Sequence, residues 1–174
     1  AQERPQLLLT GVGQLAADFQ VQVEKLQLSG DVIATKVGYP HDLCALYGAA
    51  LFGIYPSLYE GFGLPPLEAM ACSLPMMVSN RSSCPEVVGE AAILADPYNV
   101  EQMAHIMRQL REDSELRSDL VQLGLDRVNS PAFKWDRAAK QQWAAYRDDL
   151  EAFDEQPQPL IEDSAGYWMS GAMQ

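Results

Sequence analysis

The sequence predicts an α/β domain, built as a doubly wound parallel sheet of the Rossmann-like kind. Short apolar runs alternate with helical patterns from Gln6 to Ala95, and from Val100 onward the pattern is wholly helical. Strands that alternate with helices form parallel sheets covered on both faces, and right-handed crossovers then give the doubly wound arrangement. A chain of 174 residues, 48% of them hydrophobic, is long enough to bury one such core.

The first part of the chain supplies three expected strands. Each is a short run rich in apolar residues, and the three cover residues 6–10, 32–37 and 51–55. Residues 14–28 are expected to form a helix with four apolar residues on one face: Leu15, Phe19, Val23 and Leu26. A short helix is expected over residues 42–50, with Asp42 as its N-cap.

The second part of the chain supplies two more strands and a run of helices. A helix over residues 64–72 precedes strands over 76–79 and 92–95. Apolar residues then recur at helical spacing, and Pro131 separates the last two helices. In the last helix we expect the aromatic residues to face a core because of their helical spacing: Trp135, Trp143 and Tyr146.

The charge distribution divides the chain at about residue 147. The net charge is −12, and seven of the 24 acidic residues lie in residues 148–174, which hold no Lys or Arg. We therefore expect a domain over residues 6–147 and an acidic, flexible tail over residues 148–174. The negative balance argues against a nucleic-acid partner, because neutralising phosphates requires Lys and Arg.

The composition gives no support for a metal site or a membrane span. No segment approaches the roughly 20 apolar residues that cross a bilayer, and the polar N-terminus does not resemble a signal peptide. A cytoplasmic location is expected, with peripheral membrane association of a full-length enzyme as the alternative. The cysteines and histidines lack the spacing of zinc ligands, and the cysteines are expected to be reduced thiols: Cys44, Cys72, Cys84, His41 and His105.

The loop after the expected strand 51–55 is the first place to look for a ligand site, because ligands of such domains bind outside the carboxyl ends of the strands. Gly61 and Gly63 allow a tight turn and the close approach of a ligand. Pro65 and Pro66 follow where a helix would begin, and prolines are tolerated there. The backbone N–H groups of residues 62–64, with the helix dipole behind them, would form an anion site suited to phosphate.

Two carboxylates flank this expected anion site. Glu60 lies in the loop just before it, and Glu68 lies about one turn into the helix. Carboxylates accept hydrogen bonds from sugar hydroxyls, so the arrangement suits a molecule with hydroxyls on both sides of a diphosphate. A nucleotide sugar has this layout. On spacing alone, a glycine-containing loop before an ordinary helix explains the same residues equally well.

The segment also resembles a known family. Residues 55–71 read Tyr-Pro-Ser-Leu-Tyr-Glu-Gly-Phe-Gly-Leu-Pro-Pro-Leu-Glu-Ala-Met-Ala. This closely resembles the signature of the group-one retaining glycosyltransferases, the mannosyltransferase, sucrose synthase and glycogen synthase-like enzymes with two facing Rossmann-like domains. The resemblance continues through residues 74–75, 79–83, 85–92 and 96–97 and covers roughly residues 6–147.

The resemblance implies a donor-binding site in the C-terminal half of a two-domain carbohydrate-biosynthesis enzyme. Glu60 would contact the transferred sugar near its reacting face, and Glu68 would hold the ribose hydroxyls. The backbone of Gly61, Phe62, Gly63 and Leu64 would meet the sugar and phosphates, and the backbone from Val37 to Tyr39 would lie against the base. The family usually needs no metal or other cofactor and retains the anomeric configuration. The acceptor, a sugar, lipid or polysaccharide, stays open.

The chain departs from the family pattern at its beginning. The donor domain of the family opens with a strand and a basic loop that clamps the diphosphate, and an acceptor-binding domain precedes it. Neither is recognised here. In a sheet of order 3-2-1-4-5-6 the absent strand is central, so runs 6–10 and 51–55 must either pair directly or leave open edges. We therefore expect the isolated chain to be poorly stable and without transfer activity.

Two other functions stay open at this stage. One is a truncated or split, non-catalytic domain that binds a nucleotide sugar or a partner protein. The other is a sugar-nucleotide epimerase, which suits the fold but explains the two glutamates less well. Glycosyl transfer from a nucleotide sugar, by a hexosyltransferase of which this chain supplies the donor site, is the leading hypothesis.

Overall fold

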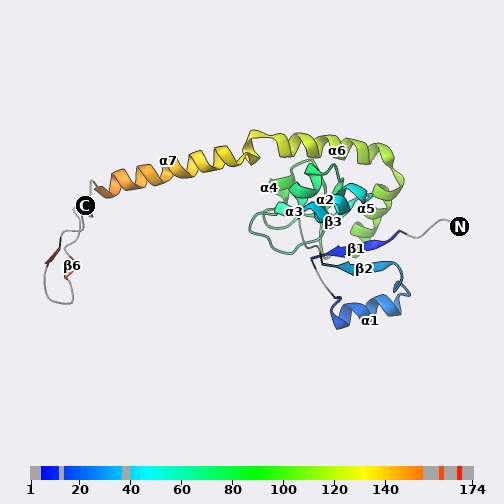
Figure 1. Cartoon of the computed structure of the whole chain (residues 1–174). Helices are drawn as coiled ribbons and strands as arrows, with labels where there is room; N and C mark the ends of the chain where they lie inside the picture. Colours follow the sequence, from blue (N-terminus) through cyan, green and yellow to red (C-terminus); the bar gives the residue numbers. More distant parts are fainter. Residues whose placement is uncertain (1–4, 12–13, 37–39, 155–160, 163–167, 170–174) are drawn as a thin grey trace. The chain divides into compact units, whose positions relative to one another are not determined.

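A computed structural model of the chain describes residues 5–11, 14–36, 40–154, 161–162 and 168–169 (Figure 1). The chain forms two compact units, Ala1–Val128 and Asn129–Gln174. The first unit holds five strands, β1 (Leu7–Thr10), β2 (Val32–Thr35), β3 (Gly53–Tyr55), β4 (Met76–Ser79) and β5 (Ile93–Ala95). Its helices are α1 (Ala17–Lys25), α2 (Pro40–Ala49), α3 (Leu64–Ala71), α4 (Cys84–Val88), α5 (Val100–Glu112) and most of α6 (Ser114–Asn129).

The strands of the first unit form two parallel sheets. β1 pairs with β2 in the register Leu7↔Val32, and β4 lies between β3 and β5, with Tyr55↔Val78 and Val78↔Leu94 as partners. Successive strands of each sheet are connected through helices, as parallel pairing requires. The predicted α/β, doubly wound fold is confirmed.

The described parts of β1 and β3 do not pair with each other, so the strands remain in separate sheets, ordered β1-β2 and β3-β4-β5. In a doubly wound sheet of order 3-2-1-4-5-6, β2 and β1 take positions 3 and 2, and β3, β4 and β5 take positions 4, 5 and 6. No described strand takes position 1, which would lie between β1 and β3. The sequence left open whether these two runs pair directly or leave open edges, and in the structure β1 and β3 leave open edges. Unpaired N–H and C=O groups along such edges favour association with other strands.

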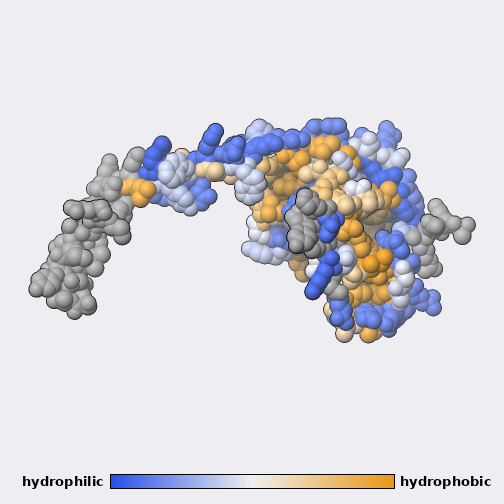
Figure 2. Space-filling model, viewed as in Figure 1, coloured by the Kyte–Doolittle hydropathy of each residue, from blue (hydrophilic) through white to orange (hydrophobic). Residues whose placement is uncertain are grey.

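The smaller sheet also leaves apolar side chains exposed. Leu8 and Ile33 are register partners on neighbouring strands, and they are 38% and 41% exposed. Figure 2 shows apolar surface, in orange, over β1, β2 and α1 of this unit. α1 is shorter than predicted and buries only Val23 of its expected apolar face, whereas Leu26 is 64% exposed.

The core lies around the larger sheet. All four residues of β4 are buried, as expected of a central parallel strand with helices on both faces. Five buried side chains form one cluster, with α5 and α6 packed on the sheet: Met77, Ala95, Ile106, Leu110 and Leu120. Gly124 of α6 lies so close to α3 that an added Cβ would come within 3.2 Å of the Cβ and Cγ atoms of Met70.

Most element positions agree with the sequence-based expectations to within a few residues, and β4 agrees at both ends. Two details differ. α2 begins at Pro40, so Asp42 lies in its first turn and is not the N-cap. α4 was not predicted, because five residues are too few to show helical periodicity.

The second unit holds the end of α6, a 3₁₀ turn at Pro131–Phe133, α7 (Trp135–Asp154) and the strands β6 (Ile161–Glu162) and β7 (Trp168–Met169), which pair antiparallel. The expectation that the aromatic residues of the last helix are packed in a core is wrong. Trp135, Trp143 and Tyr146 are 78%, 70% and 54% exposed. Helical spacing shows that residues share a face but not that another element covers that face. Among the described residues, no helix is long and apolar enough to cross a membrane.

The predicted division into a domain over residues 6–147 and a flexible tail over 148–174 stays a prediction. α7 continues through residue 147 and ends at Asp154.

Candidate functional site

The loop between β3 and α3 lies at the carboxyl end of the larger parallel sheet. Gly63 is the N-cap of α3, with φ of 100° in the left-handed region, and it is buried. Glycine adopts this backbone conformation without the strain that a side chain would impose. Pro65 and Pro66 follow in the first turn of the helix, as the sequence predicts.

The N-terminus of α3 has no side-chain cap and no acidic residue in its first turn. The prolines carry no N–H, so the amides of Gly63 and Leu64 are the donors that the backbone can offer at this end. Together with the helix dipole they favour an anion. Gly61 does not adopt a positive φ, and an added Cβ there would meet nothing within 4 Å. Its expected role in the approach of a ligand therefore stays a prediction.

The Glu60 carboxylate is held by two hydroxyl donors. The Tyr55 hydroxyl donates to Oε1 of Glu60 at 2.6 Å, and the Ser57 hydroxyl donates to the same oxygen at 2.8 Å. These hydrogen bonds lower the pKa of Glu60, with that from Tyr55 the larger cause. Burial first, and then the bond to Glu60, raises the pKa of Tyr55. At neutral pH the pair is therefore a neutral phenol and a carboxylate.

The backbone of the same loop is anchored to the segment that follows β4. The Ser82 hydroxyl donates to the carbonyl oxygen of Glu60 at 2.7 Å and accepts from its amide at 3.2 Å. The Ser83 hydroxyl donates to the carbonyl oxygens of Phe62 at 2.8 Å and of Glu60 at 3.2 Å. Two serines that lie more than 20 positions further along the chain thus hold the backbone of this loop.

Glu68 is exposed on α3, one turn beyond the N-terminus of the helix. Its charge contributes, after burial, to raising the pKa of Tyr47 on α2, and it also acts on Cys72. The side chain is therefore near α2 as well as near the end of α3. Among the described residues, no hydrogen bond links Glu68 to the loop that holds Glu60.

A basic side chain that the sequence reasoning did not assign lies at the same edge of the sheet. Arg81 follows β4, and its Nη2 atom lies 3.3 Å from Oδ1 of Asp96, which follows β5. Its guanidinium also stands 5.8 Å from the centre of the Tyr98 ring. The backbone amide of Tyr98, and then Arg81, lower the pKa of Asp96. The sequence signal that could have identified this cluster is the position of Arg81 and Asp96 just after two neighbouring parallel strands.

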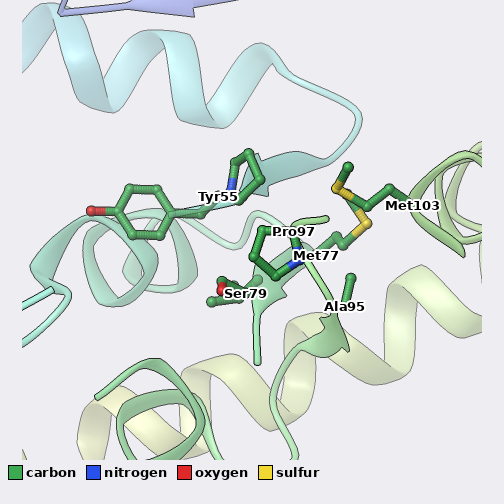
Figure 3. A pocket seen from close by; sticks show the side chains of 8 residues that line it. Tyr55, Met77, Ser79, Ala95, Pro97 and Met103 are labelled. Atoms are coloured by element: carbon green, nitrogen blue, oxygen red, sulfur yellow. The ribbon is translucent and has the colours of Figure 1, made fainter. Parts of the chain in front are cut away.

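A shallow apolar hollow lies at this edge, lined by Tyr55, Pro56, Met77, Val78, Ser79, Ala95, Pro97 and Met103 (Figure 3). The Tyr55 hydroxyl points away from Met77 and Met103 in this view. The hollow has no room for a water molecule, and neither Glu60 nor Gly63 lines it. It is therefore not where a nucleotide sugar would bind.

Two expected site residues lie outside the described residues, namely Val37 and Tyr39. Within the part of the chain that the structure describes, no three His, Cys, Asp or Glu side chains are grouped as metal ligands. The expectation that no metal or cofactor is needed stays a prediction.

Comparisons with known proteins agree with the predicted family and fold. Residues 1–126 match the family described as Glycosyl transferases group 1. O-antigen chain mannosyltransferase B of Escherichia coli is 46% identical over 107 residues, which are 61% of this chain and 27% of that protein. Sucrose-phosphate synthase from Thermosynechococcus elongatus is similar in structure, with a TM-score of 0.74 and 28% identity over 84% of this chain and 39% of that one.

A third protein shows the same fold at lower identity. Anabaena Alr3699/HepE, solved in complex with UDP, has a TM-score of 0.72 at 18% identity and matches 83% of this chain and 41% of its own. This chain thus spans less than half the length of each of these three relatives. With most of its residues matched by the family and the loop motif at the carboxyl edge of its sheet, the chain belongs to the group 1 glycosyl transferases.

Proposed function

We propose that the chain supplies the site for the nucleotide-sugar donor in a glycosyltransferase. The observation that carries this proposal is the position of the Glu60 carboxylate. Tyr55 and Ser57 hold it in the loop that leads directly into the uncapped N-terminus of α3. A fixed acceptor for sugar hydroxyls thus stands beside an end of a helix that favours phosphate.

The donor would lie across this loop. Its diphosphate would meet the amides of Gly63 and Leu64, and its hexose would lie toward Phe62 and Glu60. Both Phe62 and Leu64 are about half exposed, at 48% and 45%, which leaves them accessible to a ligand. Glu68, exposed one turn further along α3, would accept hydrogen bonds from the ribose hydroxyls.

Glu60 would act on the reacting sugar. A carboxylate beside the anomeric centre stabilises the positive charge that develops as the bond to phosphate breaks. Amides at the tip of α3 would stabilise the negative charge that develops on the leaving diphosphate. We propose that transfer proceeds with retention of the anomeric configuration, as the family resemblance implies.

The full enzyme would need more than this chain contains. The relatives are longer, and we propose that the acceptor binds to a region outside the 174 residues. Because a 46% identical relative is named a mannosyltransferase, a nucleoside diphosphate mannose is the first donor to test, within a panel that varies the base and the sugar.

Binding and turnover should be measured separately. Calorimetry of the 174-residue chain with nucleoside diphosphates, with and without the sugar, tests the donor site. Transfer by a full-length parent protein tests the reaction. Glu90→Ala, a change at an exposed acid of another loop, is the control for Glu68→Ala. Donor binding without transfer by the full-length protein would favour the non-catalytic alternative, and absence of binding to any member of the panel would refute the donor site.

A further inference from the structure

Tyr55 differs from the other residues around Glu60 because the sheet fixes its backbone. It is the last residue of β3 and the register partner of Val78 on the buried strand β4. Tyr55 also lines the apolar hollow, together with Pro97, and its ring extends away from Met77 and Met103 (Figure 3). The hydroxyl is therefore placed by the rigid part of the fold and not by the loop that it contacts.

The contact with Glu60 has the features of a charge-assisted hydrogen bond. Its oxygen–oxygen distance of 2.6 Å lies in the range of about 2.5–2.7 Å for a hydroxyl that donates to a carboxylate. Burial and the neighbouring carboxylate raise the pKa of Tyr55, which keeps its proton available for donation. The phenol can thus act as a donor throughout the neutral pH range.

Ser57 is a less definite donor. Its hydroxyl lies 2.8 Å from Oε1 of Glu60 and 3.3 Å from the carbonyl oxygen of Tyr59. A serine hydroxyl has one proton, so these two acceptors compete for it. Among the described residues, the Tyr55 hydroxyl donates to Glu60 alone, so it is the more definite anchor of the carboxylate.

We propose that Tyr55 is a positioning residue for Glu60: its hydroxyl holds Oε1 and so directs Oε2 toward the transferred sugar. The proposal rests on the proposed donor site. Tyr55 need not touch the substrate, because it acts through the carboxylate that it orients. A group held before the substrate arrives need not be reoriented during the reaction, and this preorganisation favours the transition state.

The variant Tyr55→Phe removes the hydroxyl and keeps the aromatic ring. Loss of the donor removes the largest cause of the lowered pKa of Glu60, so this pKa should rise. Because the ionised carboxylate is the active form, the acid limb of the pH profile should move to higher pH. In a full-length protein, kcat should fall about tenfold or more while KM changes little, as for an interaction made mainly in the transition state.

The first test needs no activity. The 174-residue chain, labelled with ¹³C at the glutamate carboxyls, is titrated by NMR, with Glu60 assigned through Glu60→Gln. Tyr59→Phe is the matched control, because Tyr59 is in the same loop and is 82% exposed. A higher pKa of Glu60 in Tyr55→Phe and an unchanged one in Tyr59→Phe support the proposal, and an unchanged pKa in Tyr55→Phe overturns it.

The second measurement covers the case in which Tyr55→Phe does not fold. The Tyr55 ring is then followed by NMR at neutral pH in Glu60→Ala, where loss of the acceptor should shift the Cζ resonance of Tyr55, and an unchanged resonance overturns the proposal. In a full-length protein that transfers sugar, equal kcat values for the wild type and Tyr55→Phe also overturn the positioning role. A wild-type chain that binds no donor contradicts the proposed function instead, and the two NMR measurements still decide the Tyr55–Glu60 contact.

Discussion

The hydroxyl of Ser82 bonds both backbone polar groups of Glu60, donating to its carbonyl oxygen and accepting from its amide. A single side chain from the segment after β4 thus replaces the pairing that a neighbouring strand would give this loop residue. Ser82 does so with φ of 56°, in the left-handed region that non-glycine residues seldom adopt. Strain that persists at such a residue is often found at functional sites.

The variant Ser82→Ala keeps the strained backbone and loses both hydrogen bonds. The free energy of unfolding should fall by about 1–3 kcal/mol, because two hydrogen bonds are lost and each contributes roughly 0.5–1.5 kcal/mol. Hydrogen exchange at the Glu60 amide should become faster, and donor affinity should fall as the loop loosens. Ser82→Gly loses the same bonds but relieves the strain, so it should be less destabilised than Ser82→Ala. The reverse order would show that strain at residue 82 does not matter.

The two glutamates should separate turnover from binding. In a full-length protein, Glu60→Ala should abolish transfer, because it removes the carboxylate beside the reacting sugar, while nucleoside diphosphate binding persists. Glu68→Ala should mainly weaken nucleotide binding, by about tenfold for the loss of hydrogen bonds to a charged group. Calorimetry and a transfer assay on both variants measure the two effects. Equal activity of both variants would remove these role assignments.

Gly63 and Gly61 provide a test of the loop geometry. Gly63→Ala forces a side chain into φ of 100°, which should cost roughly 1–3 kcal/mol of stability. The cause is conformational, because the added Cβ would be 3.9 Å from Sγ of Cys84, an ordinary contact. Gly61→Ala has open space and no positive φ, so it should leave the thermal unfolding midpoint almost unchanged. If a ligand approaches the backbone at residue 61, Gly61→Ala should still weaken donor binding in calorimetry.

The sequence predicted the parts of the fold that local patterns determine. The run Met76–Ser79 is apolar except for its last residue and bounded by Pro75 and Asn80, and it forms the buried strand β4 with the expected bounds. The pair Pro65-Pro66 after Gly63 likewise located the beginning of α3. Such signals depend on residues within one element and its two boundaries.

The contacts that hold the site depend on the tertiary fold and could not be predicted in this way. Ser82 and Ser83 reach Glu60 and Phe62 from more than 20 positions away, and no periodicity indicates such a contact. The exposed aromatic face of α7 is a second feature that local patterns did not predict. Regular spacing identified the face that Trp143 shares, but only the three-dimensional arrangement shows whether another element covers it.

The close packing of α6 on α3, the helix that carries Glu68, depends on a glycine. A Cβ at position 124 would lie 3.2 Å from Met70 side-chain atoms and 3.8 Å from its Cα, and Met70 is itself buried. Gly124→Ala should therefore lower stability by about 1–3 kcal/mol through overpacking, although alanine favours helix formation. Gly48→Ala is the matched control, because Gly48 is also helical and has nothing within 4 Å of an added Cβ.

The control variant should change stability in the opposite direction. Gly48→Ala should stabilise the chain by about 0.4–1 kcal/mol, since alanine reduces the conformational entropy of the unfolded chain and favours the helix. Thermal unfolding followed by circular dichroism measures both variants. If Gly124→Ala were as stabilising as Gly48→Ala, the Met70 side chain would have to move aside at little cost, and α6 could not be tightly packed against α3. Opposite signs from the same substitution in two helices would show that packing, and not helix propensity, selects glycine at position 124.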